Sequence, residues 1–201
     1  MGSVKDLEII VKPTKTKIGT GRFHFSDRYS VFDWGEMPDH IPHKGAAIAI
    51  LGAYFFERLE EKGILTHYNG LVEGGKPKKL SDIKKPSNIM DVKLLRVIKP
   101  EVKDGGYDYS SYERERNGFL IPLEVIYRNF LPEGSSVFRR LKAGEVKLED
   151  LGLKSMPLPG QRLEKPILDV STKLERTDRY LSWNEAGSIS GLSNREMLNL
   201  K

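Results

Sequence analysis

Residues 121–140 read IPLEVIYRNFLPEGSSVFRR, and the first half of this stretch has the character of a β-strand. The segment 119–130 is rich in β-branched and aromatic residues, which favour strands. On such a strand Glu124, Ile126 and Arg128 lie on one face. Charged groups are costly to bury unless they are paired. The pattern therefore predicts that this face either opens on a polar cleft or pairs its charges internally.

A polar segment follows this strand and contains Gly134-Ser135-Ser136, Arg139 and Arg140. Backbone amides and hydroxyl groups donate hydrogen bonds to phosphate oxygens, and guanidinium groups bind phosphate in a bidentate manner. The segment is therefore typical of a phosphate clamp. A network of surface salt bridges explains the same residues equally well, and the residues alone leave both interpretations open.

Helices and strands are both predicted outside this stretch. Residues 46–62 lack proline and carry an apolar stripe at helical spacing, which predicts a helix that ends at Gly63. Residues 91–99 predict a second strand, and the tyrosine-rich segment 103–118 predicts an exposed loop. The residues Ser193-Asn194-Arg195-Glu196 have the spacing of a capping box, which predicts a short helix near the end of the chain.

Two polar clusters lie in the N-terminal half. If Lys15 and Lys17 alternate on a strand, their ammonium groups share one face, and Gly19-Thr20-Gly21 then lets the backbone approach an anion. This arrangement suits a phosphate, and a solvated hairpin edge is the competing interpretation. The second cluster could hold a polar or anionic ligand, although turn chemistry explains its residues equally well. It consists of Asp27, Ser30, Asp33 and His43-Lys44-Gly45.

Residues 166–169 lead into a polar segment, 171–185, that shows no clear periodicity, and a further cluster lies in these two stretches. Carboxylates at this density suit Mg²⁺ or a cationic amine, and they suit a mobile loop equally well. The cluster consists of Asp169, Ser171-Thr172-Lys173, Glu175 and Asp178. The histidines His40, His43 and His67 are not spaced as metal ligands, so we assign no metal-ligating residue.

The composition limits the class of protein. The 201 residues include 33 Lys and Arg against 28 Asp and Glu, a net charge of +5, and no cysteine. The small surplus does not by itself indicate a nucleic-acid-binding protein, and disulfides and cysteine catalysis are excluded. No apolar run approaches the ~20 residues that span a bilayer, and no signal peptide is recognisable. We expect a cytoplasmic protein that binds neither membranes nor nucleic acid.

In their order along the chain, these clusters resemble those of the phosphoribosylaminoimidazole-succinocarboxamide synthases, the SAICAR synthetase family. The most specific match is 121–129 with Gly134-Ser135 and Arg139, which is similar to the family's Pro-[Leu/Val]-Glu-x-x-x-Arg-Asn, a short gap and Gly-Ser. Lys15-Thr16-Lys17 is similar to a Gly-Lys-x-Lys strand, with Thr14 in place of the glycine. Other similar segments are 27–33, Lys44-Gly45, 63–67, and Ser171-Thr172-Lys173-x-Glu175 with Asp178.

The resemblance implies an α+β, SAICAR-synthase-like fold related to the ATP-binding core of protein kinases. A small antiparallel-sheet domain over residues 1–100 would bind ATP, and a mixed α/β domain over 101–201 would bind the ribonucleotide and aspartate. The implied reaction belongs to de novo purine biosynthesis. It joins L-aspartate to carboxyaminoimidazole ribonucleotide through an acyl phosphate, consumes ATP with Mg²⁺, and releases SAICAR, ADP and phosphate. We also expect a homo-oligomer.

The resemblance also assigns roles to single residues. Lys15 and Lys17 would contact the ATP phosphates, and the backbone at Leu95 and Val97 would contact adenine. Lys173 and Asp178, the expected catalytic residues, would lie beside the carboxylates of aspartate and the ribonucleotide. The expected substrate-binding residues, with Arg128 and Ser135 nearest the ribonucleotide phosphate, are Asp33, Lys44, Glu124, Arg128, Ser135 and Arg139.

Members of the family continue beyond the helix that begins near Ser193 into a metal-binding strand, so the resemblance predicts that this chain lacks a C-terminal segment. Two alternative functions stay open. A different ATP-dependent phosphotransferase of related fold, such as an inositol phosphate kinase, would explain the Lys and Asp clusters. A basic RNA-binding module would instead stack bases on Tyr107, Tyr109 and Tyr112.

Overall fold

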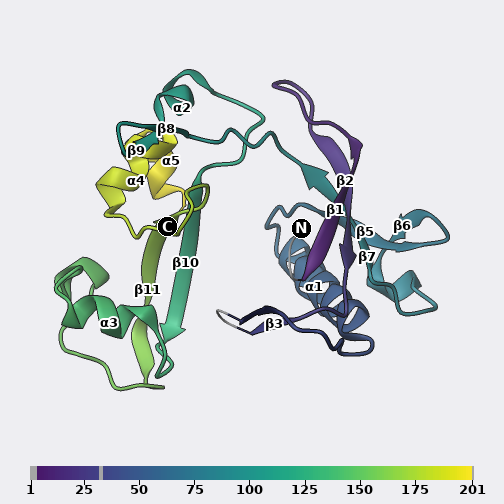
Figure 1. Ribbon diagram of the computed structural model, residues 1–201, viewed down its shortest axis with the longest axis horizontal. Coiled ribbons are helices and arrows are strands. Elements are labelled where there is room, and N and C mark those ends of the chain that lie inside the picture. Colours follow the sequence, from purple (N-terminus) through teal and green to yellow (C-terminus); the bar gives the residue numbers. More distant parts are fainter. Residues whose placement is uncertain (1–3, 32–33, 201) are drawn as a thin grey trace. The chain divides into compact units, whose positions relative to one another are not determined.

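The computed structural model describes residues 4–31 and 34–200, and the chain divides into two compact units, Met1–Arg96 and Val97–Lys201 (Figure 1). The elements of unit 1 are β1 (Lys5–Val11), β2 (Gly19–Phe25), β3 (Ser30–Val31), β4 (Gly35–Glu36), α1 (Lys44–Glu61), β5 (Tyr68–Glu73), β6 (Lys76–Lys78), the 3₁₀ helix η2 (Leu80–Asp82) and β7 (Ile89–Leu94). Those of unit 2 are β8 (Glu101–Lys103), β9 (Gly106–Asp108), α2 (Ser110–Arg114), β10 (Leu123–Phe130), α3 (Ser136–Lys142), the 3₁₀ helix η3 (Glu149–Leu151), β11 (Arg162–Thr172), α4 (Trp183–Ser190) and α5 (Asn194–Leu198).

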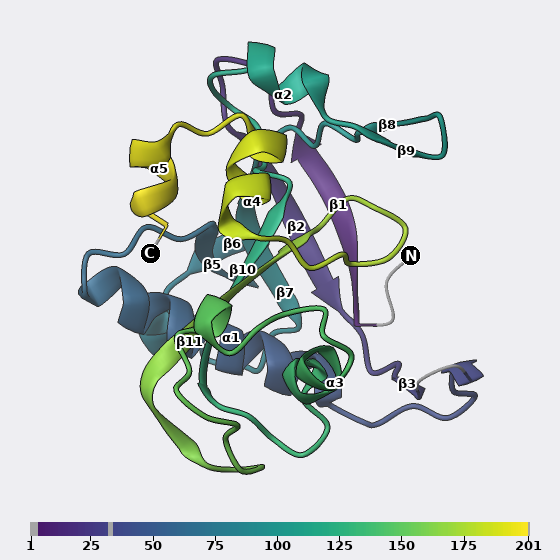
Figure 2. The ribbon, with the colours of Figure 1, turned by 90° about the vertical axis from the view of Figure 1, so that its left-hand side faces the viewer.

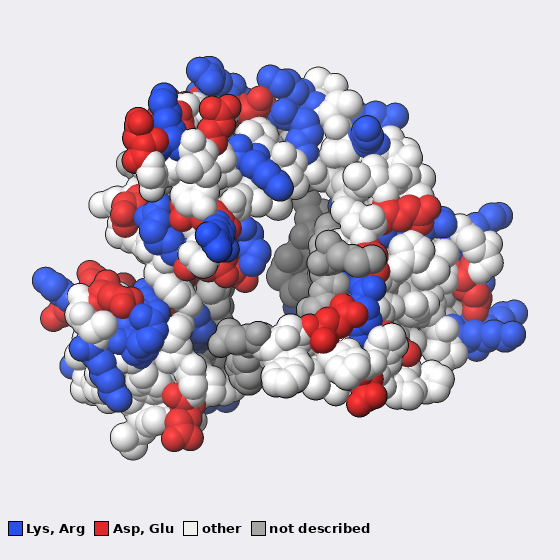
Figure 3. All heavy atoms as spheres, in the orientation of Figure 1, with Lys and Arg blue, Asp and Glu red and all other residues white. Residues whose placement is uncertain are grey.

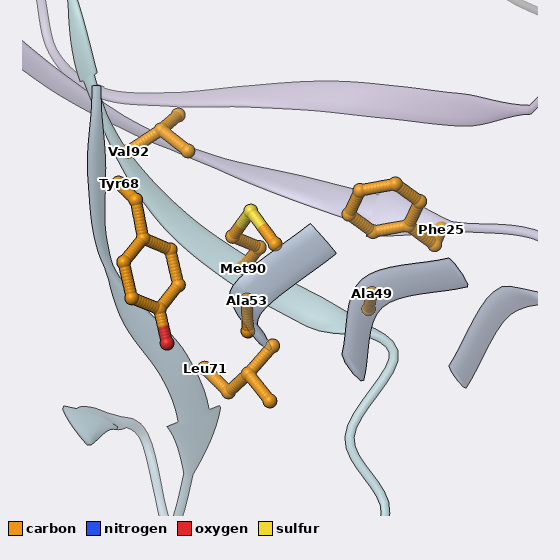
Figure 4. Close-up of a cluster of buried hydrophobic side chains, with 7 residues drawn as sticks. All are labelled: Phe25, Ala49, Ala53, Tyr68, Leu71, Met90 and Val92. Atoms are coloured by element: carbon orange, nitrogen blue, oxygen red, sulfur yellow. The ribbon is translucent and has the colours of Figure 1, made fainter. Parts of the chain in front are cut away.

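Unit 1 is built on a five-stranded antiparallel sheet with the order β1-β2-β7-β5-β6. The helix α1 packs on one face of this sheet, which confirms the helix predicted over 46–62 (Figures 1 and 2). Ala49 and Ala53 are fully buried on α1 and lie against Leu71, Met90 and Val92 of the sheet (Figure 4). Because the helix presents small side chains, it approaches the sheet closely and buries the larger ones.

Gly45, in the first turn of α1, leaves no room for a side chain. A Cβ atom at this position would lie 2.5 Å from the carbonyl oxygen and 2.9 Å from the carbonyl carbon of Phe25. Backbone atoms cannot rotate away, so we expect Gly45→Ala to destabilise unit 1 by about 1–3 kcal/mol. Urea unfolding of Gly45→Ala and of a control, Gly52→Ala, checks this prediction. A Cβ atom at position 52 would approach nothing closer than 3.4 Å. The control should gain about 0.5–1 kcal/mol, since glycine is unfavourable inside a helix. Equal stability of the two variants would contradict the close contact.

The predicted strand at Lys15 and Lys17 is wrong. Both residues are exposed and lie in the turn between β1 and β2. The turn closes because the side-chain oxygen of Thr14 accepts a hydrogen bond from the Lys17 amide at 3.0 Å, while the Thr14 amide donates to the Lys17 carbonyl at 2.8 Å. Thr14 is therefore a turn-forming residue, and Pro13 before it has no amide hydrogen to pair in a sheet.

The centre of unit 2 is the two-stranded antiparallel ribbon of β10 and β11. The strand predicted over 119–130 is confirmed from Leu123 onward. The polar segment 171–185, which shows no periodicity in the sequence, is regular at both ends, because its first two residues end the long strand β11 and its last three begin α4. Apolar clusters flank the ribbon, one under α3 and one under α4 and α5 (Figures 1 and 2).

Two helices near the end of unit 2 begin with capping boxes. The predicted helix after Ser193 is confirmed as α5, in which the Ser193 and Glu196 side chains cap each other's amide groups. Ser182 and Glu185 form the same arrangement at the start of α4. Helices of this length are marginal alone, so the caps and the burial of Met197 together hold α5 in place.

The segment 103–118, predicted as an exposed loop, is more ordered than expected. It contributes to the hairpin β8–β9 and contains the short helix α2, and Tyr112 of that helix is fully buried. The Tyr112 hydroxyl donates a hydrogen bond to the carbonyl oxygen of Ile98. Its ring packs edge-on against Phe119. The tyrosines of this segment therefore anchor it to unit 2. Within the described residues, no helix is both long and apolar enough to cross a bilayer.

Candidate functional site

The polar face predicted on β10 exists, and its charges are paired across the ribbon. In the antiparallel register Glu124 faces Ser171, Ile126 faces Asp169 and Arg128 faces Ile167. Residues that face each other directly lie on the same side of a sheet, so the ribbon brings Glu124, Arg128 and Asp169 to one face. Of the two interpretations drawn from the sequence, internal pairing is therefore confirmed.

Asp169 is the centre of a cationic cluster. Its side chain is 3% exposed, and its Oδ2 atom lies 2.7 Å from Nη1 of the equally buried Arg140 and 3.5 Å from Nε of Arg128. The Arg140 guanidinium also stacks on the ring of Tyr180 at 3.6 Å, and the Tyr180 hydroxyl is 2.7 Å from Oγ of Ser136. Two guanidinium groups share one carboxylate, so the cluster carries a net positive charge suited to an anion.

Arg128 retains hydrogen-bonding capacity inside this cluster. Its side chain is 20% exposed, and its buried Nε group makes no hydrogen bond to any described residue. A buried donor without a partner is costly, and an anionic ligand or a water molecule can satisfy it. Nε itself faces Asp169, so this carboxylate orients the side chain by charge rather than by a hydrogen bond, and the rest of the guanidinium group can bind an anion.

Ser135 lies at the start of the short helix α3 and Arg139 in its middle, and the two have different surroundings. Ser135 is the N-cap of α3, and its side-chain oxygen accepts a hydrogen bond from the Val137 amide. Arg139 is exposed and forms a salt bridge of 3.0 Å with Glu145. The structure thus brings Arg140, rather than Arg139, to the cluster at Asp169, and the role expected for Arg139 stays a prediction.

Lys173, Glu124 and Asp178 form a second polar group at the end of the ribbon. Nζ of Lys173 lies 3.0 Å from Oε2 of Glu124, and both side chains are partly exposed. The hydrogen bond to Glu124, with a smaller contribution from the charge of Asp178, raises the pKa of Lys173. Lys173 is therefore a cation at neutral pH and can neutralise a carboxylate, whereas a role as a general base is disfavoured.

A cleft of about 700 Å³ lies within unit 2 beside β11. Its lining includes Arg140 and Asp169 of the cluster, Tyr180, and the first residues of α4, Trp183 and Asn184. A volume of this size is ordinary for a small-molecule site. Arg140 belongs to the phosphate clamp that the sequence suggests, whereas Tyr180 was not predicted as a binding residue. The contact of Arg140 with Asp169, and so its place beside Tyr180, depends on the strand β11, which the sequence pattern did not predict.

Lys44 of unit 1 binds the backbone of the loop that follows β2. Its Nζ atom donates hydrogen bonds to the carbonyl oxygens of Ser26 and Arg28, at 3.0 Å and 2.6 Å. Asp27 completes this arrangement, since its carboxylate accepts hydrogen bonds from the amides of Gly45 and His43 at the start of α1. In the loop predicted to hold an anion, the charged groups of Lys44 and Asp27 thus bind neighbouring backbone groups. Substrate binding by Lys44 stays a prediction.

Asp27 makes the stability of unit 1 depend on pH. The hydrogen bond from the Gly45 amide, assisted by the His43 amide, lowers the pKa of Asp27. The folded pKa lies below that of the unfolded chain, so the carboxylate stabilises the fold above about pH 4, and this contribution is lost as the pH falls through the folded pKa. We expect Asp27→Asn to be less stable than the natural chain at pH 7, and the difference to shrink as the pH falls below about 4. Urea unfolding over this pH range measures it, and a difference that does not shrink in acid would contradict the assignment.

The remaining predicted residues lie apart from the ribbon in the sequence. Lys15 and Lys17 lie in the β1–β2 turn, and Leu95 and Val97 follow the end of β7, one on each side of the boundary between the units. Asp33 lies outside the described residues. No group of three or more His, Cys, Asp or Glu side chains within 4–31 and 34–200 is placed to hold a metal ion.

The arrangement of unit 2 does not support stacking of RNA bases. Tyr112 is fully buried and Tyr109 is 8% exposed, so neither ring offers a face to a base. The Tyr107 and Tyr109 hydroxyls both bind the segment after β11. Figure 3 shows acidic side chains beside basic ones on the visible face of each unit. A non-specific nucleic-acid site requires the opposite, exposed aromatic rings along a basic groove.

Solved structures place this fold in the SAICAR synthetase class. A type-2 SAICAR synthetase in complex with ADP superposes with a TM-score of 0.61 at 22% identity, over all of this chain and 60% of that one. A SAICAR synthase from Saccharomyces cerevisiae, complexed with SAICAR, gives a TM-score of 0.61 at 25% identity, over all of this chain and 57% of that one. The predicted α+β, SAICAR-synthase-like fold is thus confirmed.

Sequence comparison then identifies the family. A sequence model described as SAICAR synthetase matches residues 13–201. A putative phosphoribosylaminoimidazole-succinocarboxamide synthase of Archaeoglobus fulgidus is 57% identical over all 201 residues, which cover 59% of that protein. A synthase of the same name from Thermoplasma acidophilum is 34% identical over 89% of this chain and 52% of its own length. The chain belongs to the SAICAR synthetase family, and it spans between half and three fifths of these relatives.

Proposed function

We propose that this chain takes part in the ATP-dependent joining of L-aspartate to carboxyaminoimidazole ribonucleotide, which gives SAICAR, ADP and phosphate. The observation that carries the proposal is the paired polar face of the β10–β11 ribbon. There Arg128, held by Asp169, lies on the same face as Glu124, and Glu124 binds Lys173. Support comes from the 57% identical relative that bears the synthase name.

The chemistry of the reaction explains why such a face is needed. A carboxylate is a poor electrophile, so it must first accept the γ-phosphoryl group of ATP to form an acyl phosphate. The aspartate amine then attacks the acyl carbon, the C–N bond forms, and inorganic phosphate leaves. Both steps concentrate negative charge, and fixed cationic side chains lower the barrier by orienting and neutralising it.

Each predicted residue has a part in this scheme. Arg128 and Ser135 would bind the ribonucleotide phosphate, with Arg139 and Arg140 adding charge, and Glu124 would accept hydrogen bonds from the ribonucleotide. Lys173 and Asp178 would lie beside the carboxylates of aspartate and the ribonucleotide. In unit 1, Lys15 and Lys17 would contact the ATP phosphates, and the backbone at Leu95 and Val97 would contact adenine. Asp33 and Lys44 complete the proposed substrate-binding set.

Magnesium enters this proposal as the ion that accompanies ATP. The described residues offer no cluster of three acidic or histidine side chains, so they do not fit a protein-bound metal and we derive no step through one. We also propose the cytoplasm as the compartment, because the chain has no cysteine and needs no oxidising environment. A homo-oligomer stays a prediction.

Isotope transfer tests the acyl phosphate directly. The chain is incubated with magnesium ATP, L-aspartate and ribonucleotide labelled with ¹⁸O in its carboxylate. One ¹⁸O atom per turnover should appear in the released phosphate, because the attacking carboxylate oxygen leaves with the phosphoryl group. A SAICAR product accompanied by unlabelled phosphate would contradict the acyl phosphate, and ADP release with no SAICAR would favour a different phosphotransferase.

A further inference from the structure

The loop that joins β11 to α4 carries both proposed catalytic residues, and it is closed at its base. The Thr172 amide donates a hydrogen bond to the Arg179 carbonyl at 2.9 Å, and the Arg179 amide donates to the Thr172 hydroxyl at 3.0 Å. A bridge between Ser171 and Tyr180 extends this closure by one pair. Residues 173–178 therefore form a short closed loop on which Lys173 and Asp178 are exposed.

The inner side of this loop is bound by two tyrosines from the segment 103–118. The Tyr109 hydroxyl donates a hydrogen bond of 2.9 Å to Oε1 of Glu175, whose side chain is only 5% exposed. The Tyr107 hydroxyl accepts a hydrogen bond of 2.8 Å from the Arg176 amide. Arg179 reaches back and forms a salt bridge of 3.1 Å with the same Glu175 carboxylate.

These contacts divide the loop by function. Glu175 and the Arg176 backbone face the tyrosines, whereas Lys173 and Asp178, on either side of them, remain exposed. Burial of Tyr109, and then its hydrogen bond to the Glu175 carboxylate, raise its pKa, so the hydroxyl stays protonated and keeps donating at neutral pH. An irregular loop without such anchors would sample many conformations, and ordering it during the reaction would cost entropy.

We propose that Tyr107 and Tyr109 are positioning residues, which hold the loop 173–178 so that Lys173 and Asp178 are in place before substrate binds. The effect of these residues on catalysis rests on the proposed function, whereas the claim that they hold the loop does not. Both tyrosines form their hydrogen bonds to the loop through the hydroxyl group, so phenylalanine removes these hydrogen bonds and keeps the ring.

Limited trypsin digestion of the 201-residue chain tests whether Tyr107 and Tyr109 hold the loop 173–178. Lys173, Arg176 and Arg179 are trypsin sites within or next to the loop, and cleavage there requires it to open. We expect Tyr109→Phe to raise the rate of cleavage at these three sites about tenfold, as the loss of one hydrogen bond to a charged group implies. Tyr107→Phe should act in the same direction.

Tyr112→Phe is the matched control. It removes a buried hydroxyl from the same segment, but that hydroxyl binds the Ile98 carbonyl and not the loop. Its cleavage rate at the three sites should stay within about twofold of the natural chain. Equal acceleration in Tyr109→Phe and Tyr112→Phe would show general loosening of unit 2 and overturn the proposal, as would an unchanged rate in Tyr109→Phe.

Kinetics test the catalytic consequence. Tyr109→Phe should lower kcat/KM for aspartate about tenfold and leave the KM for ATP unchanged. Tyr112→Phe should change neither kcat/KM for aspartate nor the KM for ATP. Faster cleavage of the loop with unchanged kinetics would overturn the positioning role. A natural chain without any turnover would contradict the proposed function instead, and the trypsin comparison would then decide by itself whether the tyrosines hold the loop.

Discussion

An Arg128→Ala variant is expected to bind carboxyaminoimidazole ribonucleotide between about 30-fold and several thousand-fold more weakly than the natural chain. The estimate follows from the ~2–5 kcal/mol lost when one member of a buried, hydrogen-bonded charge pair is truncated. In the proposed complex the partner of Arg128 is the ribonucleotide phosphate, and Asp169, 3.5 Å from the Nε atom, holds the side chain in place for it. Calorimetric titration with the ribonucleotide measures the change, and titration with ADP should give an unaltered affinity.

Two further variants make this experiment specific. Arg162→Ala removes an exposed arginine from the same ribbon and should leave ribonucleotide affinity within about threefold, since surface charges contribute little. Arg128→Lys keeps the charge but not the planar fork, and it should recover only part of the loss. If Arg128→Ala weakened ADP and the ribonucleotide equally, Arg128 would act on the fold rather than on the ribonucleotide.

An Asp169→Asn variant is expected to lose about 3–5 kcal/mol of unfolding free energy, because it leaves the buried Arg140 without a counterion. The side chains of Arg140 and Asp169 are 4% and 3% exposed, so water cannot compensate for the missing charge. The two guanidinium groups that shared the carboxylate would also repel each other. This change is a large part of the total stability of a domain.

Unfolding should be followed in unit 2 alone, since the two units need not unfold together. The chain has two tryptophans, Trp34 in unit 1 and Trp183 in unit 2, so fluorescence in a Trp34→Phe background reports on the cleft beside β11. Asp178→Asn is the control, because it removes an exposed carboxylate from the same unit and should cost less than about 0.5 kcal/mol. Similar losses in both variants would contradict a special role for the buried cluster.

The sequence predicts those parts of the fold whose signals are local. The helix α1 is recognisable because its apolar residues repeat at helical spacing and Gly63 follows it, and α5 because Ser193 and Glu196 have the spacing of a cap. The polar face of β10 also follows from alternation alone, since Glu124 and Arg128 are four residues apart. The prediction that charges on such a face must be paired or solvated holds for any strand, and here they are paired.

The features that the sequence did not predict depend on contacts between distant segments. The first half of β11 reads RLEKP, where charged residues and Pro166 mask a strand that forms because β10 pairs with it. The choice between Arg139 and Arg140 depends on α3. Successive residues on a helix point about 100° apart, so only one of them can reach Asp169. The sequence also did not predict that Thr14 forms a turn, which the structure shows by the hydrogen bond from the Lys17 amide to the Thr14 side chain.

The central claim is tested most directly by ADP formation in four parallel reactions. Each contains the chain and magnesium ATP, with the ribonucleotide alone, L-aspartate alone, both together, or neither. The proposed function predicts sustained ADP release only where both are present, in equal amount to the SAICAR formed. Release that is indifferent to aspartate and the ribonucleotide would contradict it and indicate a phosphotransferase of another specificity.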